Sequence, residues 1–182
     1  MTSILALSGS LRRASFNTGL VRAAIGGAPA GIAVTTFDLR PLPFYDGDVE
    51  AAGFPAPVAA FRAAVAAADG ILLCSPEHNA SVSALLKNAL DWASRPPGVV
   101  QQKPIALAGA TPGGFGTVRG QMHFRHLCVF TNMHPLNKPE VLVSKASDKI
   151  DAEGRVHDPK TREQIQKQLE ALGAWTRRLR GH

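Results

Sequence analysis

A short polar segment near the start of the chain has the residue types of an anion-binding loop. Residues 8–17 read Ser-Gly-Ser-Leu-Arg-Arg-Ala-Ser-Phe-Asn, between an apolar run at 4–7 and apolar residues at helical spacing over 20–25. A strand that leads into a helix leaves free backbone N–H groups and the positive end of the helix dipole at the helix start. The hydroxyls and Arg12 add donors that suit phosphate oxygens. This segment, which we call the phosphate loop, therefore predicts a phosphate site.

The kind of phosphate follows from what the loop lacks. It holds one glycine, Gly9, where a dinucleotide fingerprint needs three, and it has no lysine, which a nucleoside-triphosphate loop requires. Hydroxyls, backbone and one arginine suit a single terminal phosphate, such as that of flavin mononucleotide (FMN). In the alternative interpretation the serines only cap the following helix. Capping accounts for one or two of these polar residues, but not for five of them with an arginine pair.

The composition indicates one globular domain over residues 1–182. Hydrophobic residues make up 45% of the chain, which is enough for a full core. No apolar run approaches the roughly 20 residues that span a bilayer, and the first residues do not have the pattern of a secretion signal. Cys74 ends one apolar run and Cys128 lies inside another, so both are expected to be buried thiols. We therefore expect a cytoplasmic protein with no membrane contact.

The net charge of +6 comes largely from the last third of the chain. There Lys160, Arg162, Lys167 and the arginines of 177–180 alternate with apolar residues of a predicted helix, as on a solvated helix face. The sequence shows neither interleaved aromatic and basic residues nor zinc-finger spacing, so no nucleic-acid partner is expected.

Short apolar runs alternate with helical periodicity along the whole chain. Strands are expected at 4–7, 33–37, 70–75 and 105–108, and a less clear fifth within 129–143, which Pro135 and Pro139 interrupt. The helix after the fourth strand is expected to end near Phe124. Strict alternation predicts parallel strands with helices on both sides. The fold class is therefore α/β, a flavodoxin-like doubly wound five-stranded parallel sheet with helices on both faces.

In such sheets ligands bind beyond the carboxyl ends of the strands, so the other strand ends should carry matching chemistry. The third strand runs into Ser-Pro-Glu-His-Asn-Ala-Ser at 75–81, and the fourth into Gly-Ala-Thr-Pro-Gly-Gly-Phe-Gly-Thr at 109–117. Backbone of this kind can approach a flat ring closely and offer N–H donors to its carbonyl oxygens. Three neighbouring loops of this character indicate a flavin site more strongly than any one of them.

The same segments resemble the NADPH-dependent FMN reductase family, most of all its quinone and chromate reductase branch. The resemblance rests on the phosphate loop, Ser-Pro-Glu-x-Asn at 75–79, Leu-Lys-Asn-Ala-Leu-Asp-Trp at 86–92 and Asn-Lys-Pro-Glu at 137–140, and it covers nearly the whole chain. It implies a homodimer or homotetramer and a bound FMN that takes hydride from NADPH or NADH. It also implies a small-molecule acceptor: a quinone, a free flavin, an azo compound or an oxyanion such as chromate.

Carried over by position, the resemblance assigns the cofactor-binding residues. They are Ser10, Arg12, Ser15, Phe16 and Asn17 around the phosphate, Pro76, Glu77, His78 and Asn79 against the ring, and Thr111 and Gly114 on its other side. The chain departs from the family at His78, Ala80 and Met122, where tyrosine is common, and at Ser83, where proline is usual. These departures bear on ring stacking and on acceptor preference.

Hydride transfer between the nicotinamide and the flavin needs no nucleophile and no metal, so neither a catalytic side chain nor a metal site is expected. Two ring residues have a second interpretation: His78 as a solvent-exposed or helix-capping residue, and Glu77 as a carboxylate at a helix start. The segment 87–95 is expected to serve packing and a subunit interface, with Arg95 either reaching a partner subunit or lying on the surface. The alternative function is a flavodoxin-type electron carrier, or a flavin-binding redox protein without strong NADPH turnover. Such carriers present acidic surfaces, whereas this chain is basic.

Overall fold

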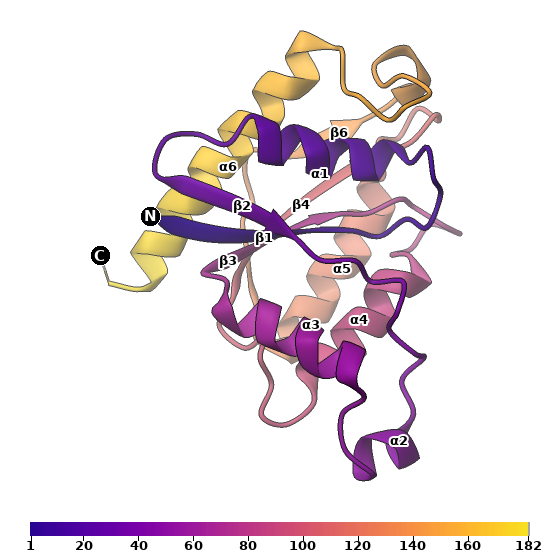
Figure 1. The fold of residues 1–182 in the computed structure, drawn as a ribbon. Helices are drawn as coiled ribbons and strands as arrows, with labels where there is room; N and C mark the ends of the chain where they lie inside the picture. Colours follow the sequence, from indigo (N-terminus) through magenta and orange to yellow (C-terminus); the bar gives the residue numbers. More distant parts are fainter. Residues whose placement is uncertain (182) are drawn as a thin grey trace.

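Parallel strands form one sheet with helices on both of its faces (Figure 1). The computed structural model describes residues 1–181. The strands are β1 (Thr2–Ser8), β2 (Ile32–Thr36), β3 (Gly70–Cys74), β4 (Pro104–Ala110), β5 (His134–Pro135) and β6 (Val141–Val143). The helices are α1 (Phe16–Gly26), α2 (Gly47–Ala51), α3 (Ala56–Ala67), α4 (Ala84–Ser94), α5 (Val118–Thr131), the 3₁₀ helix η1 (Ala146–Asp148) and α6 (Pro159–Leu179). Within the described residues no helix has both the length and the apolar character that crossing a membrane requires.

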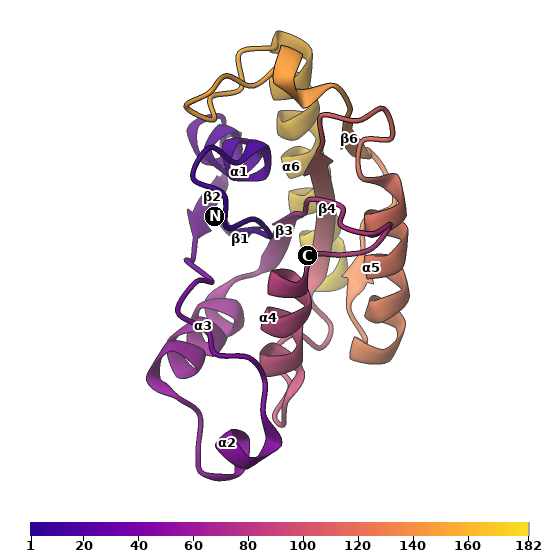
Figure 2. The same cartoon turned by 90° about the vertical axis from the view of Figure 1, so that its right-hand side faces the viewer.

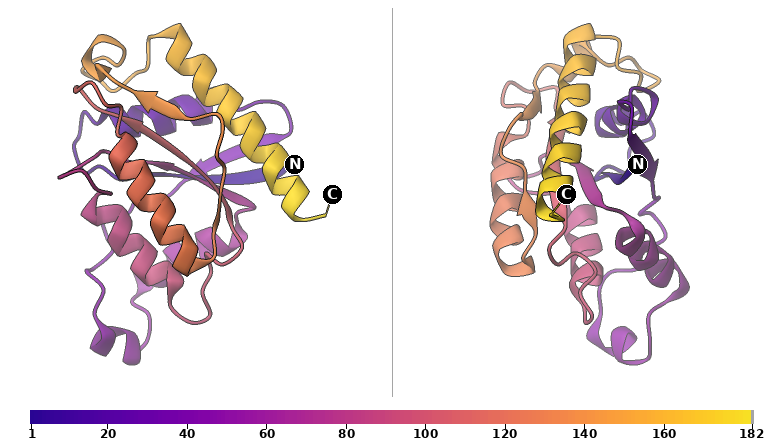
Figure 3. Two further views of the ribbon diagram at one scale, coloured as in Figure 1. Left: turned by 180° about the vertical axis from the view of Figure 1, so that it is seen from behind. Right: turned by 90° about the vertical axis from the view of Figure 1, so that its left-hand side faces the viewer.

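The strand order is β2-β1-β3-β4-β5, and β6 also pairs with β4. Helices α1 and α6 cover one face, whereas α3, α4 and α5 cover the other (Figures 2 and 3). Every residue of β3 and β4 is buried, because these central strands are covered on both faces. This explains why both strands read as continuous apolar runs rather than as alternating patterns.

Each face of the sheet has its own apolar cluster, built from the helical stripes that the sequence predicts. On one face Leu20 and Ala24 of α1 join Leu169 of α6. On the other face Phe61 of α3 joins Leu86 of α4. Residues three or four positions apart lie on one side of a helix, so a single stripe from each helix fills the space against the strands.

The predicted fold class is confirmed, and the first four strands begin and end within two residues of their expected bounds. Two expectations about the C-terminal half were wrong. Helix α5 continues to Thr131 rather than ending near Phe124, and the expected fifth strand is two short strands, β5 and β6. Pro135 and Pro139 have no N–H to donate, so the ladder along β4 is interrupted between them. The short helix α2 lies in the long segment between β2 and α3.

A buried arginine holds the C-terminal end of α4. Arg62 of α3 is 6% exposed, and its guanidinium donates to the carbonyl oxygens of Trp92 at 2.7 Å, Arg95 at 3.1 Å and Pro97 at 2.8 Å. Carbonyls at a helix end have no N–H partner within the helix. A cation at this position also complements the negative end of the helix dipole. The end of α4 is therefore fixed from the core.

The long segment between β2 and α3 is anchored on α4. The side chains of Asn88 and Trp92 both donate to the carbonyl oxygen of Pro43 at 2.8 Å, and the Asn88 side chain accepts from the N–H of Tyr45 at 2.8 Å. The expectation that Asn88 and Trp92 serve packing is confirmed.

The strand register places the carboxyl-terminal ends of β1, β3 and β4 next to one another. Ser8 of β1 pairs with Cys74 of β3, and Cys74 pairs with Ala108 of β4. The loops that leave these strands therefore start side by side at the same edge of the sheet.

Candidate functional site

The phosphate loop ends in a capped helix start that keeps free donors. Ser15 is the N-cap of α1, and its hydroxyl accepts from the N–H of Thr18 at 3.2 Å. Within residues 1–181, the next two N–H groups, of Phe16 and Asn17, have no acceptor. The capping interpretation of Ser15 is thus confirmed, and two N–H groups and the helix dipole remain available to an anion.

Arg12 is the exposed cation of this loop. In the part of the chain that the structure describes, its guanidinium has no carboxylate partner and lies 5.7 Å from the ring centroid of Phe16. The N–H of Arg12 donates to the hydroxyl of Ser10 at 3.4 Å, which keeps the turn closed. An unpaired guanidinium beside a helix start is suited to bind phosphate oxygens.

Asn17 has a different role from the one that sequence reasoning gave it. It is 3% exposed, its side-chain NH₂ donates to the carbonyl oxygen of Ala110 at 3.0 Å, and its side-chain oxygen accepts from the N–H of Ala110 at 2.9 Å. The carboxamide thus makes, at the end of β4, the two hydrogen bonds that the backbone of a neighbouring strand would otherwise make. It joins the phosphate loop to the end of another strand, and only its backbone N–H faces the anion site.

We call residues 75–81 the ring loop. It closes in a tight turn: the N–H of His78 donates to Ser81 at 3.1 Å, and the N–H of Ser81 donates to His78 at 2.9 Å. The two central residues, Asn79 and Ala80, have φ of 50° and 58°. Two consecutive positive φ values are typical of a type I′ turn, which asparagine tolerates and alanine does not favour. His78 is exposed, as one of its two interpretations expects.

Glu77 fixes the ring loop to the start of α5. Its carboxylate accepts from the N–H of Gly120 at 3.0 Å and from Nε of Arg119 at 2.7 Å. Burial raises the pKa of Glu77, but the Gly120 N–H and the Arg119 guanidinium outweigh it, so this pKa lies below its usual range. Glu77 is thus a helix-start carboxylate, although of α5 rather than of the helix that follows it in sequence.

A second contact joins the ring loop to α5. The hydroxyl of Ser81 and Nδ1 of His123 are 2.6 Å apart. Gly120 makes this approach possible, because a Cβ there would lie 3.0 Å from the carbonyl oxygen of Ser81. The ring loop is therefore attached to the first turns of α5 at both of its ends.

We call residues 109–117 the glycine loop. A Cβ on Gly109 would lie 1.9 Å from the hydroxyl oxygen of Thr117 and 2.6 Å from the carbonyl oxygen of Ser75. Only glycine allows this approach, which sets β4, the ring loop and the start of α5 against one another. Thr111 accepts from the N–H of Gly113 at 3.3 Å, whereas Gly114 is exposed and a Cβ there would meet nothing within 4 Å. The tip of this loop is open backbone.

The structure thus brings the predicted site residues to one edge, with direct ties between neighbouring loops. Sequence reasoning missed four residues that make or allow these ties: Thr117, Arg119, Gly120 and His123. Their signal was present in part, because a Gly-Thr pair precedes the α5 pattern. What no local pattern contained was a carboxylate 43 residues away that caps this helix.

The residues fit FMN rather than a di- or triphosphate. The donors of the phosphate loop are two free N–H groups, hydroxyls and one arginine, which suits one terminal phosphate. The Asn17 tie sets this cradle beside the glycine loop, whose exposed backbone at Gly114 leaves room for a flat group. The site therefore has a charged end at the phosphate loop and open, uncharged backbone at the glycine loop, which suits the two ends of FMN.

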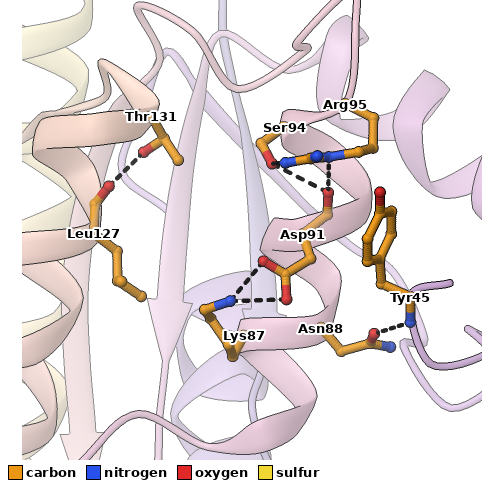
Figure 4. A network of polar contacts seen from close by, with 8 residues as sticks. All are labelled: Tyr45, Lys87, Asn88, Asp91, Ser94, Arg95, Leu127 and Thr131. Carbon is orange, nitrogen blue, oxygen red and sulfur yellow. Dashed lines mark hydrogen bonds and ion pairs between the residues drawn. The ribbon is translucent and has the colours of Figure 1, made fainter. Parts of the chain in front are cut away.

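Arg95 lies folded on its own helix rather than reaching outward (Figure 4). Its Nε donates to the carbonyl oxygen of Asp91 at 3.0 Å, and its guanidinium lies 5.1 Å from the ring centroid of Tyr45. Lys87 forms an exposed ion pair with Asp91 at 2.6 Å. Among residues 1–181, the side-chain hydrogen bonds and ion pairs of these residues stay within α4, and none reaches the three loops.

Comparisons with known proteins show what the chain as a whole is similar to. The family model for NADPH-dependent FMN reductase matches residues 2–148. The chain is 50% identical over 179 residues to an NAD(P)H-dependent FMN reductase of Pseudomonas aeruginosa, covering 98% of this chain and 97% of the relative. It is 48% identical over 184 residues to an NADPH:quinone oxidoreductase of Arabidopsis thaliana, covering 98% and 93%. The solved structure of FerB, a flavoenzyme NAD(P)H:(acceptor) oxidoreductase from Paracoccus denitrificans, has a TM-score of 0.88 at 26% identity, covering 98% of each chain.

Proposed function

The chain belongs to the NADPH-dependent FMN reductase family, and from this premise we propose how its residues serve an FMN-dependent NAD(P)H oxidoreductase that reduces quinones and flavins. The observation that carries the assignment of the site is the helix start of α1. It combines two free N–H groups with an unpaired Arg12, and Asn17 ties it to the end of β4. Phosphate binding there sets the orientation of the rest of the cofactor.

Each loop has one task in this proposal. When bound, FMN supplies the redox chemistry, taking hydride from NAD(P)H and giving it to the acceptor. Arg12, Ser10 and the N–H groups of Phe16 and Asn17 hold the phosphate, while Ser15 keeps the helix start capped. Pro76, Glu77, His78 and Asn79 frame one side of the ring, and Thr111 and Gly114 frame the other. No side chain has to form a bond to substrate, so these residues bind, orient and exclude water.

The acceptor class follows from the surroundings of the ring loop and from the relatives. Phe115 in the glycine loop is 68% exposed, and the Arg119 guanidinium lies 5.1 Å from its ring centroid. An exposed aromatic ring offers a face on which a flat molecule such as a quinone can stack. The Arabidopsis relative is named for the same class. Azo compounds and chromate are narrower alternatives.

Steady-state oxidation of NADPH, with and without a quinone, tests the function directly. Quinone-dependent oxidation supports the reductase, whereas FMN binding without turnover supports the electron-carrier alternative. FMN should bind more tightly than riboflavin, because riboflavin lacks the phosphate that the helix start holds. Equal affinities for the two flavins would contradict the assigned phosphate site.

We propose that the working form is a homodimer or homotetramer in which a second copy covers α5. Three apolar side chains on the outer face of this helix are largely exposed: Met122 at 59%, Val129 at 80% and Phe130 at 88%. Beside them lies a hollow of about 320 Å³ between α4 and α5, lined by Leu90 and His126 among others. Exposed apolar residues that gather in this way mark protein interfaces.

Light scattering of the wild type and of Phe130→Glu tests the oligomer. The wild type should be oligomeric and Phe130→Glu should dissociate. Phe44→Glu is the matched control, since Phe44 is 80% exposed but belongs to the segment before α2 rather than to α5. A monomeric wild type with full activity would contradict the proposal.

The site extends across the chain, so we propose that residues 1–182 act as a single FMN-binding domain. The two cysteines support a proposed cytoplasmic location. Cys74 and Cys128 are both buried and unpaired, as the sequence predicts, and burial raises the pKa of each thiol to about 12. Buried free thiols of this kind are typical of proteins from a reducing compartment.

A further inference from the structure

A hollow beside the phosphate loop shares Ser10 with the site described above and is otherwise separate from it. It has a volume of about 240 Å³ and lies between α1 and the segment that follows β2. Its floor is apolar, with Val21 and Ile25 from α1 and Leu39 from the segment after β2. Val21 and Leu39 are buried, whereas Ile25 is 40% exposed. An apolar floor that is open to solvent suits a flat ligand group such as an aromatic base.

The rim of the hollow carries an acid and a base directly after β2. Asp38 and Arg40 form an ion pair at 3.3 Å, with their side chains 58% and 57% exposed. An exposed pair of this kind contributes little to stability, so either partner can exchange it for a ligand group. A third charged residue, Arg22, also lines the hollow, but its guanidinium donates to the carbonyl oxygen of Glu153 at 2.9 Å.

The hollow borders the phosphate loop and the start of α4, the helix that follows the ring loop. Ser10 and Leu11 of the phosphate loop line one side of it. Leu85 lines another side, and this residue follows closely after the ring loop, two positions beyond the α4 N-cap Ser83. An extended molecule could therefore place one end here and the other end against the ring loop.

The chemistry of this rim points to one ligand. A carboxylate such as that of Asp38 can accept a hydrogen bond from a ribose 2′-hydroxyl, and a guanidinium such as that of Arg40 can pair with a 2′-phosphate. We propose that the hollow binds the adenosine end of the nicotinamide co-substrate. Its base lies on the apolar floor, and Arg40 selects NADPH through the 2′-phosphate. Asp38 favours the 2′-hydroxyl of NADH, so the pair sets the preference between the two. This inference rests on the proposed function, because it assigns the site for that reaction's reductant.

Binding of adenosine 2′,5′-bisphosphate to the FMN-loaded protein tests the inference without turnover. Calorimetry should detect binding that competes with NADPH. Arg40→Ala should weaken the bisphosphate tenfold or more while changing adenosine 5′-monophosphate less than twofold. Arg162→Ala is the matched control, an exposed arginine on α6 outside this hollow, and should change neither ligand. Absence of bisphosphate binding to the wild type would overturn the inference even if NADPH is oxidised.

Two further variants test the hollow without relying on Arg40→Ala alone. Asp38→Asn should raise the ratio of kcat/KM for NADPH to that for NADH. Ile25→Trp fills the hollow and should raise KM for both nucleotides at least fivefold, with FMN affinity unchanged. If Arg40→Ala and Ile25→Trp both keep wild-type bisphosphate affinity and KM values, the hollow is not the adenosine site. A wild type that binds the bisphosphate but does not oxidise NADPH would contradict the proposed reaction instead.

Discussion

The phosphate loop and the ring loop leave the same edge of the sheet, yet they are held in opposite ways. In the phosphate loop, the Arg12 guanidinium and the first N–H groups of α1 have no polar partner among residues 1–181. In the ring loop, Glu77 and Ser81 use their side chains to bind α5. An anion needs unsatisfied donors, whereas a flat ring needs a frame that does not move. Substitutions in the first loop should therefore affect FMN affinity, and those in the second should affect stability.

Asn17→Ala should have the largest effect. Although Asn17 belongs to the phosphate loop, its loss should lower stability as well as FMN affinity. The buried carboxamide makes two hydrogen bonds to Ala110, and its loss leaves the N–H and the C=O of that residue unpaired. We expect unfolding free energy to fall by about 3 kcal/mol, with weaker FMN binding. Urea unfolding and FMN titration would measure both. Asn17→Asp keeps the acceptor but sets a buried carboxylate against the Ala110 carbonyl oxygen, so it should not restore wild-type stability; a stability equal to the wild type for both variants would remove this role.

Arg12→Ala should change FMN affinity alone and leave folding stability unchanged. An exposed guanidinium without a carboxylate partner adds little to folding, but a charge-assisted contact to phosphate is worth about 1.5–3 kcal/mol. The FMN dissociation constant should thus rise about 10-fold to 150-fold at an unchanged unfolding midpoint. Arg13→Ala, the neighbouring exposed arginine, is the control and should have a much smaller effect. An unchanged dissociation constant for Arg12→Ala would show that the phosphate lies elsewhere.

In contrast to Arg12→Ala, Glu77→Gln should act mainly on stability. The free energy of unfolding should fall by about 1–2 kcal/mol at pH 7. The native pKa of Glu77 lies below its usual range: burial opposes the ionised form, but the Gly120 N–H and Arg119 stabilise it more. The stabilisation is therefore present above about pH 4.3, the ordinary value for glutamate, and is lost as the pH falls through the native pKa. The stability difference between wild type and variant should shrink between pH 7 and pH 3. A difference that is constant over this range would mean that the charge of Glu77 is unimportant.

Ala80→Gly should have the smallest effect and the opposite sign. Ala80 sits at φ 58°, where a Cβ is disfavoured and glycine is not. After allowing for the greater freedom of glycine in the unfolded chain, we expect a gain of about 0.5 kcal/mol. The matched control is Ala63→Gly in the middle of α3, which should lose about 1 kcal/mol. Thermal unfolding of the two variants should therefore shift in opposite directions.

The fold could be predicted where a strand is buried on both faces of the sheet, because such a strand has a continuous apolar sequence. β3 and β4 are continuous apolar runs, so their bounds were found closely. The C-terminal half was harder to predict because α5 carries Val129 and Phe130 on its exposed face. Apolar residues that face solvent imitate the run of a strand, and the end of α5 was therefore assigned to the fifth strand.

The site was predictable to the level of loops but not of contacts. Strand ends with serine, asparagine and glycine identify which loops meet a ligand. The partners of Asn17 and Glu77 lie 93 and 43 residues away, and they depend on the register of β4 and on where α5 starts. A polar residue in a predicted loop thus has two uses, ligand binding or loop fixation. Only the three-dimensional arrangement separates them, as it does for Asn17.

The two buried thiols can report how often the native protein opens locally. Cys74 ends β3 immediately before the ring loop, and Cys128 lies in α5, the helix to which that loop is tied. With each pKa raised to about 12 by burial, almost no thiolate exists at neutral pH, and an alkylating reagent must wait until the segment opens. The two labelling rates therefore report how often each segment exposes its interior. Rates that rise together in Glu77→Gln would show that strand end and helix open as one cooperative unit.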